Sequence, residues 1–73
     1  LSIYPNPALD KINISFDFKV EKDIEIMVYN SLGNPVVNSK VLKEINVSHL
    51  PSGLYFVELK QGNVRYVGKF IKP

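Results

Sequence analysis

The side chains in this sequence that are able to bind a metal or catalyse a reaction are seven carboxylates and one histidine. Asp17, Glu21 and Asp23 fall near one expected loop, where their oxygens could hold a calcium ion. A calcium loop needs several oxygens at fixed spacing and usually a glycine for the bend, and this stretch has neither. His49 has no second histidine and no cysteine with which to share a metal. We therefore expect a solvated turn and no metal site.

Nucleophilic and phosphate chemistry also lack their usual sequence patterns. The serines stand in no G-x-S-x-G setting, the single histidine has no obvious acid partner, and there is no glycine-rich phosphate loop. A net charge of +2 with dispersed basic residues does not favour a nucleic-acid partner. No apolar run approaches the roughly 20 residues that cross a bilayer. We expect a non-catalytic domain with no cofactor, no nucleic-acid partner and no membrane insertion.

The elements that carry these side chains are predicted to be strands, because the hydrophobic pattern has a period of two. In residues 11–18, for example, Ile12, Ile14, Phe16 and Phe18 share one face. Strands are predicted at 11–18, 24–30, 36–42, 44–48, 54–60 and 64–72, with 36–42 at an edge and 54–60 at the centre. The sequence predicts one all-β domain over residues 1–73, a small immunoglobulin-like antiparallel β-sandwich of about seven strands. A small barrel is the alternative.

Turn residues separate the predicted strands. Gly33, within "SLGNP", is free to take a positive φ. In "HLPSG", which begins with His49 and Leu50, Pro51 presets φ and Gly53 can supply the left-handed residue of a type II turn. Tyr55 follows this turn and is expected in the core. Because the chain has no cysteine, the core must hold the domain together, with a modest stability on the order of 5 kcal/mol.

The segment "YPNP" near the start suggests a stiff entry that does not join a ladder. Pro5 and Pro7 each fix φ near −65° and lack an N–H, and they bias Tyr4 and Asn6 toward extended geometry. We expect the Tyr4 ring to pack on the sandwich edge while the prolines stop a preceding strand from pairing onward. Capping an edge and being recognised by a partner are two compatible roles for this segment.

Four segments in this order and spacing closely resemble the C-terminal sorting domain (type A) of cargo proteins of the type IX (Por) secretion system of Bacteroidota. They are "IYPNPALDKINISF", "IMVYNSLGNPV", "INVSHLPSGLYFVEL" and "KFIKP". The resemblance implies a sandwich that is the C-terminal piece of a longer secreted protein and acts as its secretion signal. The N-terminal cargo would cross the periplasm, be exported by the type IX translocon with outer-membrane shuttle proteins, and end secreted or on the cell surface. In many members a surface sortase cleaves ahead of the domain and attaches the cargo.

The resemblance also implies that the closing segment, Lys69, Phe70, Ile71 and Lys72, is important for export. An edge strand at the chain end presents free N–H and C=O groups with which a receptor can pair. We therefore expect that removing residues 69–73 abolishes export more than it abolishes folding. The same exposed edge makes an edge-strand homodimer of the isolated domain a candidate assembly.

Two other functions are compatible with a small sandwich of this kind. The first is a carbohydrate-binding or adhesive module of a secreted enzyme, which would show aromatic rings facing solvent on one sheet. The second is a structural spacer similar to a fibronectin type III repeat, which would occur in tandem copies. The sequence does not identify the cargo.

Overall fold

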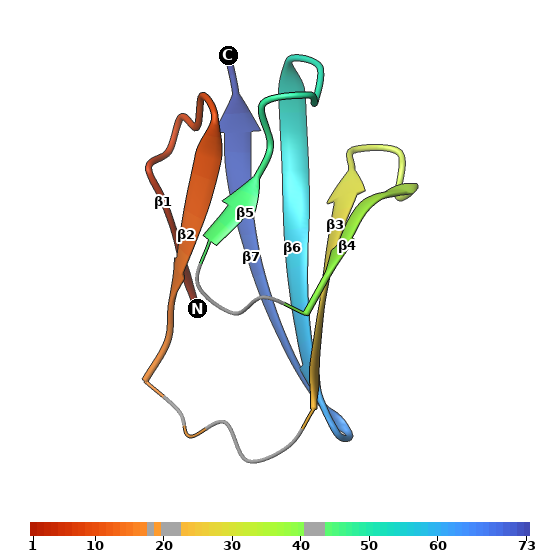
Figure 1. Ribbon diagram of the computed structural model, residues 1–73. Coiled ribbons are helices and arrows are strands. Elements are labelled where there is room, and N and C mark those ends of the chain that lie inside the picture. The colour runs from red at the N-terminus through yellow and green to blue at the C-terminus, as the bar shows by residue number, and fades with distance from the viewer. Residues whose placement is uncertain (18, 20–22, 41–43) are drawn as a thin grey trace.

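The computed structural model describes residues 1–17, 19, 23–40 and 44–73. Within these residues the chain is all-β, with seven strands and no helix (Figure 1). The strands are β1 (Ser2–Tyr4), β2 (Lys11–Ser15), β3 (Ile24–Asn30), β4 (Pro35–Ser39), β5 (Glu44–Asn46), β6 (Gly53–Gln61) and β7 (Val64–Lys72). Phe18, Glu21 and the end of the predicted strand 36–42 lie outside the described residues. No helix in the described ranges is long and apolar enough to span a membrane.

The strands form two antiparallel sheets that pack as a sandwich of 34 × 22 × 15 Å (Figure 1). One sheet has the order β1-β2-β5 and the other the order β4-β3-β6-β7. The predicted all-β sandwich is therefore confirmed, and the two separate sheets exclude the barrel. β6 lies inside the larger sheet and β4 at its edge, as their sequences predict. The other edge of that sheet is β7, the last strand.

The entry segment differs from its prediction, because part of it does join a ladder. Residues Ser2–Tyr4 pair antiparallel with β2, and Ile3 is opposite Ile14. The pairing ends at Pro5, where the chain has no N–H to donate. The prolines thus end a short edge strand instead of preventing one. β2 is also shorter than predicted and ends at Ser15.

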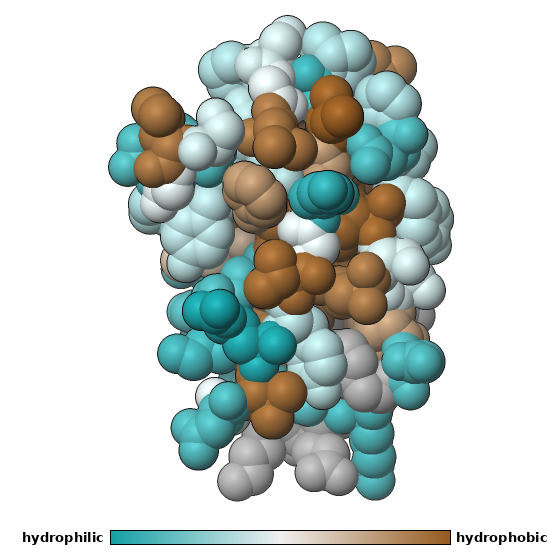
Figure 2. Space-filling model, turned by 180° about the vertical axis from the view of Figure 1, so that it is seen from behind, coloured by the Kyte–Doolittle hydropathy of each residue, from teal (hydrophilic) through white to brown (hydrophobic). Residues whose placement is uncertain are grey.

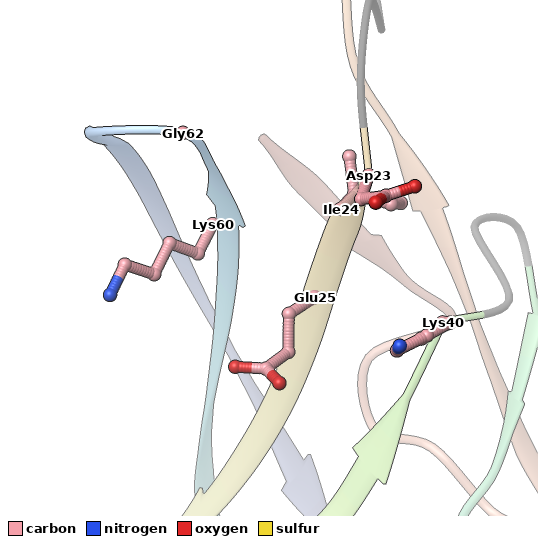
Figure 3. Close-up of a pocket in the computed structure, with 6 residues that line it drawn as sticks. All are labelled: Asp23, Ile24, Glu25, Lys40, Lys60 and Gly62. Carbon is pink, nitrogen blue, oxygen red and sulfur yellow. The ribbon is translucent and has the colours of Figure 1, made fainter.

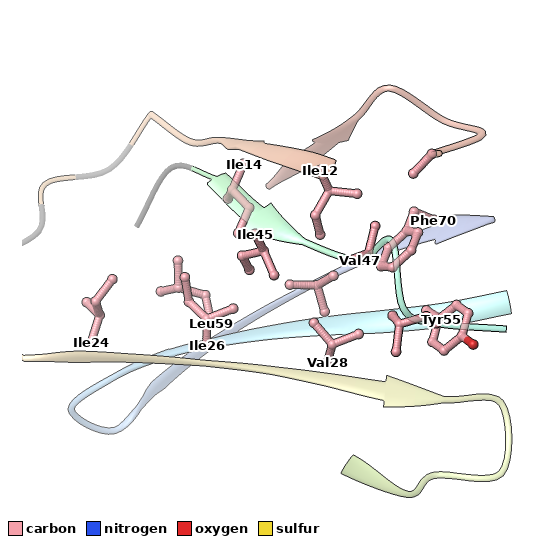
Figure 4. Packing of buried hydrophobic residues seen from close by; sticks show 13 residues of the cluster. Ile12, Ile14, Ile24, Ile26, Val28, Ile45, Val47, Tyr55, Leu59 and Phe70 are labelled. Carbon is pink, nitrogen blue, oxygen red and sulfur yellow. The ribbon is translucent and has the colours of Figure 1, made fainter. Parts of the chain in front are cut away.

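The core lies between the sheets and is filled by alternate residues of facing strands (Figure 4). On β6, for example, Tyr55, Val57 and Leu59 are buried, while the residues between them face outward or are only partly buried. Fully burying one such aliphatic side chain stabilises the fold by about 1.5–3 kcal/mol. The buried apolar residues are Ala8, Ile12, Ile14, Ile24, Ile26, Val28, Ile45, Val47, Leu50, Tyr55, Val57, Leu59 and Phe70.

Candidate recognition site at the joined ends of the chain

The loop between β1 and β2 carries the two prolines and closes over the end of β7. The peptide bonds that precede Pro5 and Pro7 are both cis. Asn6 lies between the prolines, and its Oδ1 accepts a hydrogen bond of 2.9 Å from the Ile71 amide. The amide of Ala8, a fully buried residue, donates to the Ile71 carbonyl at 2.8 Å. The Asn6 side chain supplies the acceptor for the Ile71 amide and the Ala8 amide supplies the donor for the Ile71 carbonyl, so both outward backbone groups of Ile71 are satisfied within the chain.

Lys72 is the last residue of β7, and it is buried, with 9% of its surface exposed. Its Nζ donates to the carbonyls of Val47 at 2.7 Å, Leu50 at 3.0 Å and Ser48 at 3.3 Å. An ammonium has three donors and no acceptor, so three carbonyls match its hydrogen-bonding capacity. Hydrogen bonds from a charged donor contribute about 1.5–3 kcal/mol, more than neutral ones. Lys72 therefore fastens the end of β7 to the β5–β6 turn.

The β5–β6 turn presents these carbonyls because its own sequence fixes its shape. Asn46 Oδ1 accepts hydrogen bonds from the Ser48 amide at 2.9 Å and the Ser48 hydroxyl at 2.7 Å, as asparagine does in turns. The Leu50 amide donates to the Val47 carbonyl at 3.0 Å. A carbonyl has two lone pairs, so the Val47 oxygen can also accept from Lys72.

Two stacked aromatic residues support this end of the sandwich from inside. Tyr55 and Phe70 are opposite each other on β6 and β7, with ring centroids 5.3 Å apart and planes inclined by 15°. Both rings are buried, as Figure 4 shows for their packing with Val47. The Tyr55 hydroxyl donates to the Pro51 carbonyl at 2.6 Å, which satisfies the polar tip of a buried ring. The stack thus ties β7 to the β5–β6 turn a second time.

These contacts bring together segments that are far apart in the sequence, and we call the arrangement the terminal clasp. It consists of the hydrogen bonds of Asn6 and Ala8 to Ile71, of Lys72 to Val47, Ser48 and Leu50, and of the Ser52 hydroxyl to the Pro73 carbonyl at 2.8 Å. In Figure 1 the β1–β2 loop, the β5–β6 turn and the end marked C meet at the same end of the sandwich. The proline segment and the closing segment, singled out in the sequence, are therefore in direct contact.

The remaining residues singled out in the sequence lie around the clasp or away from it. Tyr4 is 51% exposed and lines a shallow hollow with Asn13 and Ser15. Gly33 lies in the β3–β4 turn with a φ of +86°, and Gly53 begins β6 with a φ of +152°. Gly33 thus takes the positive φ that the sequence predicts. The φ of Gly53 is far from the value of about +80° that the third residue of a type II turn needs, so Gly53 is not the left-handed turn residue that the sequence predicts.

From the sequence, Lys69 and Lys72 are both expected at one exposed strand end, and the structure separates them. Lys69 is exposed on the outer face of the larger sheet, while Lys72 is buried below the clasp. The signal that could have shown this is the period of two, because Lys72 follows Phe70 by two residues and must share its inward face. Lysine is almost never buried unless it has hydrogen-bond acceptors nearby, and the sequence does not show that such acceptors are present.

The outer face of the larger sheet exposes an apolar patch beside the clasp. Leu54 is opposite Ile71 across β6 and β7, and Phe56 and Val67 lie on the same face. These four residues are 37–55% exposed. Figure 2, which views the molecule from behind, shows apolar side chains gathered over the middle of the molecule with polar ones around them. We call these four residues the outer patch.

The hollow drawn in Figure 3 does not have the properties of a binding site. It holds about 260 Å³, and Glu25 lies in it between Lys60 on β6 and Lys40 after β4. With Asp23, the lining carries two carboxylates and two ammonium groups, so its charges balance. Among the described residues no group of three or more histidine, aspartate or glutamate side chains could hold a metal ion. Glu21, part of the calcium hypothesis, lies outside the described residues.

Replacing Asn6 with alanine tests the clasp on its N-terminal side. The change removes the acceptor for the Ile71 amide and leaves both prolines in place. We expect the free energy of unfolding, measured with urea, to fall by about 1 kcal/mol. Asn13→Ala is the matched control, because Asn13 makes only a 3.4 Å exposed bond to the Tyr4 carbonyl. Equal losses in the two variants would contradict the role given to Asn6.

Comparison with known protein families shows the family of this chain. A family model described as "Secretion system C-terminal sorting domain" matches residues 2–73, which include every residue of the terminal clasp. A comparison with curated proteins gives no match. The fold and the extent of the match agree with the resemblance seen in the sequence. The chain belongs to the family of C-terminal sorting domains of the type IX secretion system.

Proposed function

We propose that this domain directs a cargo protein fused to its N-terminus through the type IX outer-membrane translocon, and that the surface around the terminal clasp is what the machinery recognises. The family match supports a sorting signal for type IX secretion. The observation that carries the second part is the contact of Asn6 and Ala8 with Ile71. It joins the two terminal motifs into one surface, which a receptor can contact in a single binding event.

The clasp suits recognition because it holds a surface in one conformation before binding. The backbone of Ile71 is fixed by its hydrogen bonds to Asn6 and Ala8, and its neighbours Phe70 and Lys72 direct their backbone groups toward β6. Its side chain is nevertheless 50% exposed, next to the exposed Leu54. A surface that is ordered in advance loses less entropy on binding, so a modest apolar contact gives more affinity.

The position of the N-terminus suits a domain that carries a fused cargo. In Figure 1 the N-terminus lies away from the clasp, so a fused cargo would leave the recognition surface open. In this proposal the folded domain passes through the periplasm, meets the translocon and its shuttle proteins at the clasp, and carries the cargo to the surface or the medium. A surface sortase then cuts ahead of β1 and attaches the cargo.

The carbohydrate-binding alternative receives less support from the exposed side chains. Sugar rings stack on flat aromatic faces, whereas three of the four residues of the outer patch are aliphatic. Phe56 is the only aromatic member of the patch and is 37% exposed. An aliphatic patch with a polar surround suits contact with a protein surface better.

The test compares two exposed β-branched residues of the same strand. Ile71 and Val64 are each 50% exposed, but Ile71 lies at the clasp and Val64 at the opposite end of β7. We expect Ile71→Ser to reduce export of a reporter fused ahead of the domain by about tenfold, since a central apolar contact of about 1.4 kcal/mol is lost. Val64→Ser should leave export unchanged.

Stability is measured on both variants, so that a recognition defect is separated from unfolding. Surface changes of this kind usually alter the free energy of unfolding by about 0.5 kcal/mol or less. Normal export of the Ile71→Ser reporter would remove the clasp surface from the recognition step. A reporter that stays in the periplasm with the unmodified domain, in a host that exports its own cargo, would remove the sorting function itself.

A further inference from the structure

The outer edge of β7 is closed at one point and open along the rest of its length. β7 pairs with β6 alone within its sheet, and Ile71 directs its N–H and C=O away from β6 toward Asn6 and Ala8. Backbone groups along an antiparallel strand alternate in direction, so Val67 and Lys69 must point theirs the same way. No backbone partner for either outward pair is found among the described residues. Two residues are therefore available for pairing just below the clasp.

An apolar groove runs beside this open stretch. It holds about 450 Å³ and lies between β7 and the start of the chain, with Leu1 and Ile3 on one wall and Phe56 and Val67 on the other. Gly68 forms part of its floor, and a Cβ atom there would approach Ile3 Cγ1 to 2.9 Å. The absence of a side chain at this position allows β1 to approach the strand closely. An extended chain that paired with β7 would place alternate side chains against these walls.

The charges around the groove indicate what kind of segment fits. Lys69 is the only charged side chain that lines it, and Lys69 has no carboxylate within reach in the described structure. Arg65, further along the strand, is already paired with Glu58 at 3.3 Å. An acidic residue on an incoming strand would therefore meet an uncompensated cation. A basic residue at the same position would be repelled.

We propose that the open edge of β7, from Arg65 to Lys69, binds an extended segment of a partner protein by β-strand addition. The segment pairs with the backbone of Val67 and Lys69, inserts alternate apolar side chains into the groove and places a carboxylate against Lys69. Asn6 of the clasp also lines the groove, but the backbone groups that pair here belong to Val67 and Lys69 and not to the clasp, so the proposal stands whether or not the clasp is what the export machinery recognises.

A second copy of this chain fits the same edge less well. If two β7 strands paired antiparallel about Val67, Lys69 of each copy would face Arg65 of the other. If they paired about Lys69, the two lysines would face each other, and if they paired about Gly68, each Lys69 would face Val67 and stay without a carboxylate. Like charges directly opposite each other destabilise a strand pair. The groove therefore favours an acidic partner over a homodimer.

The experiment uses the isotopically labelled 73-residue chain, acetylated at Leu1 because a free α-ammonium there would add a second positive charge to the groove. The ligands are short capped peptides of alternating valine and threonine. One peptide carries a glutamate near its centre and the other a lysine at the same position. We expect the glutamate peptide to shift the amide resonances of Val67 and Lys69 and to slow their hydrogen exchange. It should bind about tenfold more tightly than the lysine peptide at low salt, and the difference should shrink as salt screens the charges.

Two charge-reversal variants complete the test. Lys69→Glu should reverse the preference between the peptides, while Lys60→Glu, on the neighbouring strand and outside the groove, should preserve it. Equal binding of both peptides to the unmodified chain, or shifts confined to the other edge at β4, would overturn the proposal. So would concentration-dependent protection of Val67 and Lys69 without any peptide, because that would assign the edge to a second copy.

Discussion

A chain that lacks residues 69–73 will not fold. The deletion removes Phe70, whose ring is fully buried against Tyr55, and truncating such a side chain to alanine alone costs about 3–5 kcal/mol. It also removes Lys72 with its three hydrogen bonds, and it leaves the start of β6 without its partner strand. A domain of this length has a free energy of unfolding of about 4–11 kcal/mol, and the summed losses are as large as this value. Circular dichroism and the dispersion of amide resonances measure the result.

Deletion of Pro73 alone is the control for this experiment. It removes only the exposed bond from Ser52 to the Pro73 carbonyl, so the shortened chain should stay folded. A cooperative unfolding transition in the chain that lacks residues 69–73 would contradict the expected collapse. The result bears on export, because the sequence alone suggested that this deletion would abolish export more than folding. With Phe70 and Lys72 buried, loss of export after the deletion would not by itself identify a recognition residue.

The sheet architecture could be predicted from the sequence because most of the longer strands show a period of two. Ile24, Ile26 and Val28 on β3 are buried, as the period of two requires, and the apolar β6 lies inside its sheet. Strand β1 was missed because only three residues form it, too few to show a period. Its pairing depends on the neighbouring β2, which no pattern within the segment itself reveals.

The site could be predicted as a list of segments but not as an arrangement. The family resemblance pointed to the proline segment and the closing segment separately, and nothing in their residue types states that Asn6 accepts from the Ile71 amide. That contact joins residues 65 positions apart, and such pairing depends on the whole topology. The burial of Lys72 follows from alternation with Phe70, but its acceptors come from a turn whose position only the fold supplies.

Replacing Lys72 with methionine tests whether the buried ammonium holds the clasp. Methionine keeps most of the length of the side chain and its apolar packing, but it removes the ammonium donor from the carbonyls of Val47, Ser48 and Leu50. The Val47 carbonyl keeps the bond from the Leu50 amide. A buried polar group without its partner costs about 1–3 kcal/mol, and water can reach part of this turn because Ser48 is exposed. We expect a loss of about 3 kcal/mol in the free energy of unfolding, measured with urea.

Lys69→Met is the matched control, because it makes the same chemical change on the same strand. Lys69 lies three residues before Lys72, on the exposed face and away from the clasp carbonyls. It should alter the free energy of unfolding by about 0.5 kcal/mol or less. Hydrogen exchange adds a local measurement: in Lys72→Met the Leu50 amide, which donates to Val47, should exchange faster than the amides of β3. If both methionine variants were equally stable, the clasp would be held by Phe70 and Asn6 without the lysine. The hydrogen bonds of the ammonium would then contribute nothing to the stability of the domain.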